Sequence, residues 1–345
     1  RGREEAVDET NRHWAPLPRT ARRRDHGRLR LWRHAGAAEG DDEGSSDGPP
    51  PVPESVGGRF LLNRQIGSGS YSHVHLGIDK DTGEKVAVKL EWVMASQGLR
   101  LLYEAKLYTT ALGSGACLPR VRWHGVEGSY NVMVMDLLGP SLEDLFRSCD
   151  RRFSLKTVLM LAEQMLDAIE YVHSCGVVHR DIKGSNFLIG VGERSGCVHI
   201  MDFGLAKRYR DSAGKHVQGF QKNGFTGTVR YASLNVHRGF EPSRRDDVEA
   251  IGYVLMHFNR GRLPWQGVKA GSRQAKNQQI YCCKSQISDD ELCKGFPEEF
   301  VRYFQHCRSL EFSDRPDYDY LRGLMRDVFE REGFQCDLCF DWLSP

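Results

Sequence analysis

Two short segments, residues 178–188 and 201–207, constrain this chain more than any other feature of its sequence. The first holds an acid, a lysine and an amide at relative positions 0, +2 and +5, and the second adds another acid. These side chains are Asp181, Lys183, Asn186 and Asp202. Carboxylate and amide oxygens suit Mg²⁺, which proteins usually bind together with phosphate oxygens. A neighbouring lysine can neutralise charge on a phosphoryl group. The two segments therefore indicate a site for phosphoryl transfer.

A glycine-rich turn and a lysine-bearing strand precede these segments. Gly67 and Gly69, followed by Val74, suit a loop that closes over phosphates, where the backbone must approach closely. Alone, such a loop is a plain turn about as often as a nucleotide clamp. Lys89 ends a β-rich run and Glu104 lies on a run with helical spacing. They favour the clamp, because an ion pair between them would orient the ammonium group.

The order and spacing of these groups resemble those of protein kinases. The resemblance implies that Asp181 orients the substrate hydroxyl and that Lys183 offsets charge on the γ-phosphoryl group of ATP. It implies that Asn186 and Asp202 hold Mg²⁺. Lys89 would hold the α- and β-phosphates, with Glu104 as its partner.

Length and periodicity agree with a chain built from two lobes. A chain of 345 residues exceeds what one hydrophobic core normally holds. The resemblance implies an α+β, bilobal protein kinase fold, with a small β-rich N-lobe over about 58–138 and a larger α-helical C-lobe over about 139–345. The apolar patterns predict strands near 60–62, 74–77, 86–90, 120–124 and 130–135, and helices near 99–112, 141–148, 154–175, 246–260, 297–308 and 317–332.

Residues 1–57 differ from the rest of the chain. An arginine-rich stretch is followed by an acidic run rich in Gly, Ser and Pro, and neither part has a periodic apolar face. This composition predicts a disordered tail. The basic cluster is either a nuclear or nucleic-acid-binding signal or simply a solvated tail, and the second interpretation is preferred.

Composition also narrows the range of partners and locations. The net charge is only +2, so nucleic acid is not expected as a partner. No apolar run reaches the roughly 18 residues that span a bilayer, so no membrane association is expected. The 10 cysteines are expected to be reduced in an intracellular, cytoplasmic or nuclear protein.

Five further segments make the resemblance narrower. They are residues 139–146, 226–233, 243–247, 263–267 and 340–342, and they are similar to the casein kinase 1 family of Ser/Thr protein kinases. The most selective feature is the run 233–235, Ser-Leu-Asn, at a point where most protein kinases carry Ala-Pro-Glu. The resemblance covers about residues 59–345. It implies a monomeric Ser/Thr kinase whose protein substrates are acidic or already phosphorylated.

The same resemblance assigns binding residues. It places an anion pocket at Arg230, Gly267, Arg273 and Lys276. Guanidinium groups pair bidentately with phosphate, so this pocket would hold a phosphoserine of the substrate. The alternatives are exposed charges on a solvated face, or an autoinhibitory phosphate.

The resemblance also predicts the nucleotide site. Met135 would be the gatekeeper, and the hinge 136–138 would bind adenine through its backbone. Asp247 would brace the catalytic loop, residues 178–188. The complete predicted set for ATP is Ile66, Gly67, Gly69, Val74, Ala87, Lys89, Met135, Asp136, Leu138 and Leu188. Any of the apolar members could instead belong to the core.

Three departures from the family pattern bear on activity. Ser72 replaces the third glycine of the loop, and Gly184 and Ser185 replace the usual Pro-Asp. Glycine beside a metal ligand adds backbone freedom, so we expect slower turnover at worst. Cys336 and Cys339 replace aromatic or apolar residues and are expected to pack as small apolar groups in preference to binding zinc.

Two other functions remain open at this point. A kinase-shaped scaffold without activity would usually have lost Lys89, Asp181, Asn186 or Asp202, and none of these is lost. A small-molecule phosphotransferase is disfavoured, because the long segment from 202 to 235 suits a protein substrate better.

Overall fold

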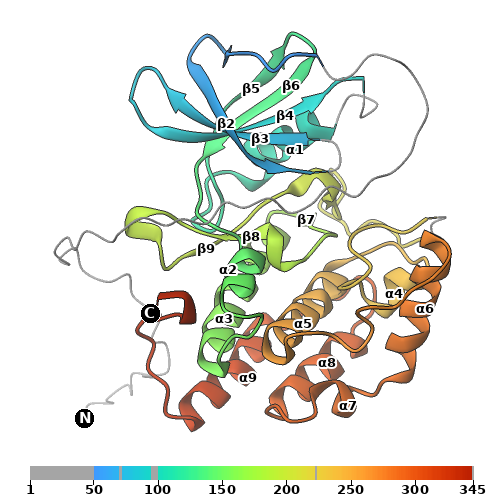
Figure 1. Ribbon diagram of the computed structural model, residues 1–345. Coiled ribbons are helices and arrows are strands. Elements are labelled where there is room, and N and C mark those ends of the chain that lie inside the picture. The colour runs from blue at the N-terminus through green and yellow to red at the C-terminus, as the bar shows by residue number, and fades with distance from the viewer. Residues whose placement is uncertain (1–49, 70–71, 95–99, 222–223, 344–345) are drawn as a thin grey trace, which may run out of the picture. The chain divides into compact units, whose positions relative to one another are not determined.

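The computed structural model describes residues 50–69, 72–94, 100–221 and 224–343. Within them, a smaller lobe of antiparallel strands lies above a larger lobe of helices (Figure 1). The predicted α+β, bilobal architecture is confirmed. The strands are β1 (Ser55–Val56), β2 (Phe60–Ser68), β3 (Ser72–Asp79), β4 (Lys85–Trp92), β5 (Val121–Glu127), β6 (Tyr130–Asp136), β7 (Val177–Val178), β8 (Phe187–Ile189), β9 (Val198–Ile200) and β10 (Lys207–Arg208). The α-helices are α1 (Arg100–Leu107), α2 (Leu142–Ser148), α3 (Leu155–Ser174), α4 (Leu234–His237), α5 (Arg244–Arg260), α6 (Arg273–Gln286), α7 (Asp289–Cys293), α8 (Glu299–Ser309) and α9 (Tyr318–Arg331).

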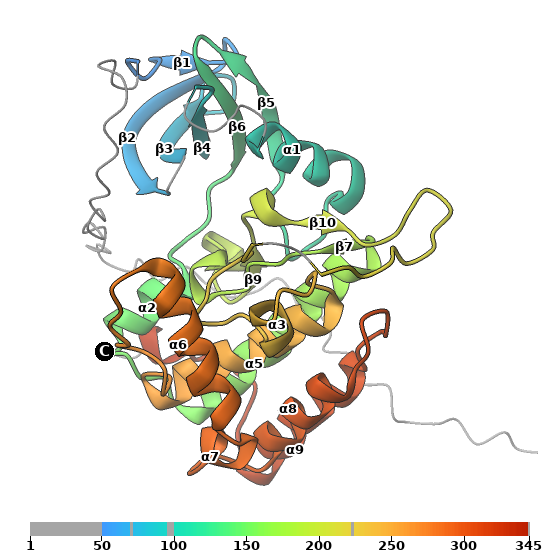
Figure 2. The ribbon, with the colours of Figure 1, turned by 90° about the vertical axis from the view of Figure 1, so that its right-hand side faces the viewer.

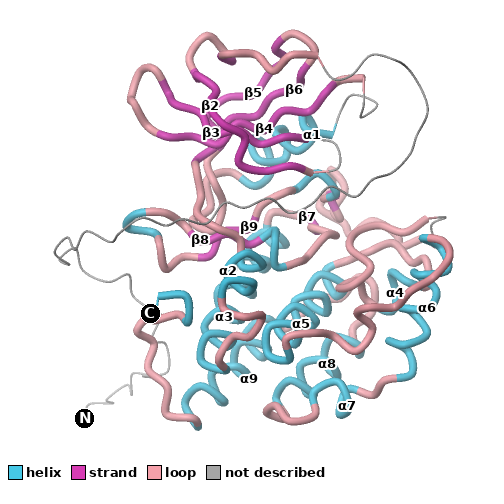
Figure 3. Tube along the Cα trace, viewed as in Figure 1, coloured by secondary structure: helices cyan, strands magenta, loops and turns pink. Residues whose placement is uncertain are grey.

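The smaller lobe is built on one six-stranded sheet in the order β1-β2-β3-β4-β6-β5 (Figure 3). Valines at alternate positions of β4 and β6 fit its pleated and buried surface. One face buries Val86, Val88 and Val134 in a core of its own. The other face packs on α1, whose Leu101 and Ala105 join the main core of the protein. The sheet and α1 therefore form one layer each, and both border the region between the lobes.

Long helices with clear N-caps form the larger lobe. The side chain of Ser154 accepts a hydrogen bond from Thr157 N at the start of α3, and Ser243 with Asp246 forms a capping box at the start of α5. α3 packs against both α5 and α9 (Figure 2). The sequence predicted all three helices within about two residues of their bounds.

The smaller lobe includes residues that the sequence assigned to the tail. β1 pairs with β2, Val56 is fully buried, and Tyr130 donates a hydrogen bond from its hydroxyl to Pro50 O at 2.6 Å. Residues 50–57 therefore belong to the smaller lobe, whereas the sequence analysis placed them in the tail. A two-residue strand is too short to leave a periodic signal, which explains the error. The rest of the predicted tail, residues 1–49, lies outside the described residues.

Other local expectations also need correction. The helix predicted near 99–112 is α-helical only to Leu107 and continues as a π-helical turn over Tyr108–Leu112. The helix α6 was not predicted, because Ile280 and Lys284 are its only buried residues and give no apolar period. Cys336 and Cys339 are exposed, so they do not pack as apolar groups. None of the helices that the structure describes combines the length and hydropathy needed to traverse a lipid bilayer.

Candidate active site

An ion-pair network joins the smaller lobe to the segment that carries Asp202. Lys89 Nζ lies 2.8 Å from Glu104 Oε2 and 3.0 Å from Asp202 Oδ1. Burial alone would lower the pKa of Lys89, but the charges of the two carboxylates raise it above its usual range. In turn, the Lys89 charge lowers the pKa of Asp202 to about 2. Glu104 Oε1 also accepts a hydrogen bond from Phe203 N, which ties α1 to the same segment.

Asp181 is held by donors on both of its carboxylate oxygens. Lys183 Nζ donates to Oδ2 at 2.6 Å, and Thr228 Oγ1 donates to Oδ1 at 2.7 Å. The side-chain amide of Asn186 donates to the backbone oxygen of Asp181 at 2.9 Å. The three residues that the sequence spaced at 0, +2 and +5 thus converge on one point, and Thr228 joins them from a distant segment.

A buried aspartate fixes the backbone just before Asp181. Asp247, on α5, accepts hydrogen bonds from His179 N at 2.7 Å and from Arg180 N at 2.9 Å. Arg180 has a φ of 68° and Asp202 also has a φ of 68°, a left-handed conformation that L residues adopt only when their surroundings impose it. The backbone on both sides of the site is therefore set by tertiary contacts.

The oxygens left over at this site suit a divalent cation. Because the Asn186 amide nitrogen already bonds to Asp181 O, its Oδ1 faces elsewhere and has no donor among the described residues. Asp202 uses Oδ1 for Lys89 and leaves Oδ2 available. The described part of the chain holds no cluster of three or more His, Cys, Asp or Glu placed for a metal. Two such oxygen ligands, completed by phosphate and water, fit the coordination habits of Mg²⁺.

Comparison with known families agrees with this geometry. The family model of the protein kinase domain matches residues 60–322. The chain belongs to the protein kinase family. A phosphotransferase that uses ATP with a divalent metal and acts on proteins follows from that membership.

In this kinase, the sheet register aligns the residues predicted to contact the nucleotide. Gly67 pairs with Val74 across β2 and β3, and Val74 pairs with Lys89 across β3 and β4. Two positions before Lys89 on β4, Ala87 pairs with Met135 of β6. Of the remaining predicted residues, Ile66 lies on β2, Leu188 lies on β8, Leu138 follows β6, and Gly69 N donates to Ser72 O.

The backbone N–H groups of the predicted hinge, residues 136–138, are not all available to a ligand. The N–H of Asp136 donates to Arg120 O at 3.0 Å, and its carboxylate accepts from Arg122 Nε at 2.8 Å. The N–H of Leu138 has no acceptor in the described ranges. Of the two residues predicted to bind adenine at the hinge, Leu138 therefore keeps a backbone donor that is not already engaged, and Asp136 does not.

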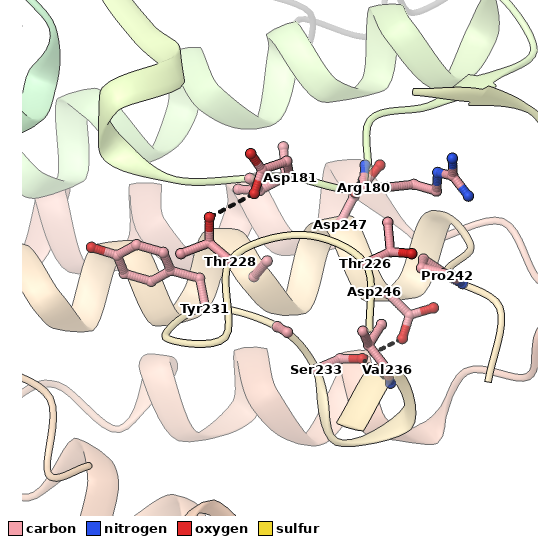
Figure 4. A pocket seen from close by; sticks show the side chains of 13 residues that line it. Arg180, Asp181, Thr226, Thr228, Tyr231, Ser233, Val236, Pro242, Asp246 and Asp247 are labelled. Atoms are coloured by element: carbon pink, nitrogen blue, oxygen red, sulfur yellow. Dashed lines mark hydrogen bonds between the residues drawn. The ribbon is translucent and has the colours of Figure 1, made fainter. Parts of the chain in front are cut away.

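On the substrate side, a small pocket lies between the catalytic loop and the segment after Thr226 (Figure 4). Thr228 and Tyr231 line one side of it and Asp181 lines another. None of the kinase's predicted anion-pocket residues lines this pocket, and no hydrogen bond in the described ranges joins them to one another. Trp265 Nε1 donates to Arg230 O at 2.8 Å, Gly267 has a φ of 87°, and Arg273 and Lys276 lie on the first turn of α6.

Sequence reasoning did not identify two residues of this site. Thr228 lay inside a family-like motif, but nothing in its context indicated a bond to Asp181. Glu241 was not singled out at all, yet its Oε1 accepts from Arg180 at 2.8 Å and from Lys207 at 3.0 Å. Both contacts join segments more than thirty residues apart, and the sequence carries no local signal for them.

Proposed function

We propose that this kinase is a serine/threonine protein kinase of casein kinase 1 type. It transfers the γ-phosphoryl group of ATP, with Mg²⁺, to Ser or Thr in acidic or phosphate-primed protein substrates. The proposal rests on two sets of hydrogen bonds, one that joins Lys89 to Glu104 and Asp202 and one that joins Lys183 and Thr228 to Asp181. An inactive scaffold has no need to keep both sets in register.

The residues around Asp181 suit transfer to a hydroxyl. Each carboxylate oxygen has a second lone pair, so Asp181 can accept the proton of a Ser or Thr hydroxyl while Lys183 and Thr228 hold it in place. The Lys183 ammonium, 2.6 Å from Asp181, offsets charge where the transferred group would lie. Loose phosphoryl transfer needs orientation more than a strong base, and this arrangement supplies it.

Unpaired cations support the preference for acidic or primed substrates. In the ranges that the structure describes, neither Arg273 nor Lys276 forms an ion pair, although the rest of the surface pairs many of its arginines. The side chain of Arg230 bonds to the hydroxyl of its neighbour Tyr231 and lies over its ring, and its charge also acts on the Glu143 carboxylate. Three cations with no carboxylate at salt-bridge distance in the described ranges, together with the backbone of Gly267, favour an anionic ligand. The resemblance to casein kinase 1 supports the same proposal, and with it a monomeric, intracellular protein of the cytoplasm or nucleus.

Phosphate transfer by the purified chain tests the proposal. The substrates are two peptides that differ only in a phosphoserine three residues before the acceptor serine, with ATP and Mg²⁺. We expect faster transfer to the primed peptide and none with Asp202→Asn. Lys276→Gln should raise the KM of the primed peptide, whereas Lys294→Gln, at an exposed lysine after α7, should leave it unchanged. Failure to phosphorylate either peptide or casein would favour the scaffold function and refute the proposal.

A further inference from the structure

A single lysine is buried in the otherwise polar helix α6. Lys284 is only 2% exposed, and no carboxylate in the described part of the chain forms an ion pair with it. Its ammonium donates to Ala232 O at 2.6 Å and to Val229 O at 3.1 Å. It also lies 4.6 Å from the ring centre of Tyr253 and 4.9 Å from that of Trp265. Two carbonyls and two aromatic faces thus surround the ammonium in place of a direct salt bridge, and the buried carboxylate of Glu249 attracts it from a longer distance.

This arrangement is costly, so it calls for a physical reason. Burial lowers the pKa of Lys284 well below its ordinary value, because desolvation disfavours the charged form. A methionine or leucine would fill the same space without this penalty. What an apolar side chain cannot do is hold backbone carbonyls, and both carbonyls belong to the segment that carries Thr228 and Arg230.

Lys284 does not act on this segment alone. Trp265 Nε1 donates to Arg230 O, and its ring faces the Lys284 ammonium, so the two side chains share one cluster. Three carbonyl groups, those of residues 229, 230 and 232, are therefore anchored to the larger lobe within four residues. The segment is fixed at one end by Thr228, which bonds to Asp181, and at the other by Ser233, which bonds to Asp246.

We propose that Lys284 is a positioning residue that sets the path of residues 229–232 and thereby the position of Arg230 relative to Arg273 and Lys276. The geometry supports this because one helix, α6, carries Arg273 and Lys276 at its start and Lys284 near its end. The hydrogen bonds from Lys284 to Val229 O and Ala232 O thus hold the backbone around Arg230 against the helix that bears the other two cations. The part of this inference that concerns phosphate-primed peptides rests on the proposed function.

The test compares Lys284→Met with Lys284→Gln and the wild-type enzyme. Methionine keeps the length and apolar stem of lysine but has no donor, whereas glutamine keeps a neutral donor for one carbonyl. Lys294→Met is the matched control at an exposed lysine. For each protein, kcat and KM are measured with the primed peptide, with the unprimed peptide and with ATP, together with the melting temperature.

We expect Lys284→Met to raise the KM of the primed peptide about tenfold and to reduce its advantage over the unprimed peptide by a similar factor. The KM of ATP should stay within about twofold, since none of the groups that Lys284 contacts belongs to the predicted nucleotide site. Lys284→Gln should give an intermediate ratio. A residue that merely supported the fold would lower the melting temperature and the amount of active enzyme without changing the ratio between the two peptides.

The outcomes separate this inference from the proposed function. If the wild-type enzyme transfers phosphate to no peptide, the proposed function fails. If it prefers the primed peptide and both Lys284 variants keep that preference, the inference about Lys284 is wrong while the proposed function stands. If Lys284→Met does not fold, the preference of Lys284→Gln for the primed over the unprimed peptide decides. A preference equal to that of the wild type overturns the inference.

Discussion

Two adjacent aspartates at the start of α5, Asp246 and Asp247, are both buried but have opposite surroundings. Asp247 accepts hydrogen bonds from His179 N, Arg180 N and His173 Nε2, at 2.7, 2.9 and 2.9 Å. Burial by itself would raise the pKa of Asp247, but these donors lower it below its ordinary value. We therefore expect Asp247→Asn to be strongly destabilising.

The magnitude follows from the number of bonds. Whichever oxygen of Asp247 becomes an amide nitrogen, at least one backbone N–H, of His179 or of Arg180, loses its acceptor in a buried position. An unpaired buried N–H costs about 1–3 kcal/mol, and the remaining bonds weaken because the acceptor is no longer charged. The total is about 2–4 kcal/mol of the free energy of unfolding. Since these N–H groups fix the residues just before Asp181, kcat should fall as well.

Asp246→Asn is the matched control, with the opposite expectation. Burial raises the pKa of Asp246 to about 6, despite hydrogen bonds from Ser233 and Ser243. A folded-state pKa above the unfolded value means that this group favours folding at low pH, and that the benefit is lost as pH rises through about 6. Asparagine does not ionise. Relative to the wild type, the free energy of unfolding of the variant should therefore rise by about 1 kcal/mol between pH 5 and pH 8.

Urea denaturation at pH 5 and pH 8, with kcat measured at pH 8, tests both expectations. The reasoning is refuted if Asp247→Asn costs less than about 1 kcal/mol. It is equally refuted if Asp246→Asn at pH 8 destabilises the protein as much as Asp247→Asn. The two variants would then respond alike, although the pKa values of the two aspartates are shifted in opposite directions.

Two further substitutions probe the segment that faces Asp181. Glu241→Gln removes the charge that neutralises Arg180 and Lys207, so we expect a loss of about 2 kcal/mol in stability and a lower kcat, measured by denaturation and peptide phosphorylation. An unchanged melting temperature and kcat would contradict this. Thr228→Val removes the hydroxyl that bonds to Asp181, so kcat should fall about tenfold while the KM of ATP stays constant. A larger effect on ATP than on kcat would contradict the assigned contact.

Whether a contact in this molecule could be predicted depends on how far apart its residues lie in the sequence. Asp181, Lys183 and Asn186 lie within six positions of one another, so their spacing alone predicted that they converge. Lys89 and Glu104 were matched through their positions on a strand and a helix, and the 2.8 Å contact between them agrees with that expectation. Periodicity predicted α3 and α5 for the same reason, because the pattern that buries a helix repeats locally.

The features that could not be predicted rest on tertiary contacts between distant residues. Lys284 lies in a helix whose other charged residues are exposed, and a lysine in such a helix is normally solvated. Its burial depends on Tyr253, Trp265 and the carbonyl of Ala232, which only the folded chain brings together. The same holds for Glu241. Sequence patterns carry the chemistry of this site, whereas the groups that hold the substrate side in place are set by the fold.

Gly184 shows how a correct observation in the sequence can have a different cause in the structure. From the sequence, this glycine is expected to add backbone freedom, yet its φ is not in the left-handed region that requires glycine. A Cβ atom here would lie only 3.0 Å from Cζ of Phe258, whose ring packs against those of Phe146 and Phe153. The neighbouring bonds from Lys183 and Asn186 to Asp181 are intact. Gly184 is thus accounted for by the space beside Phe258, and its presence by itself gives no reason to expect a loosened catalytic loop.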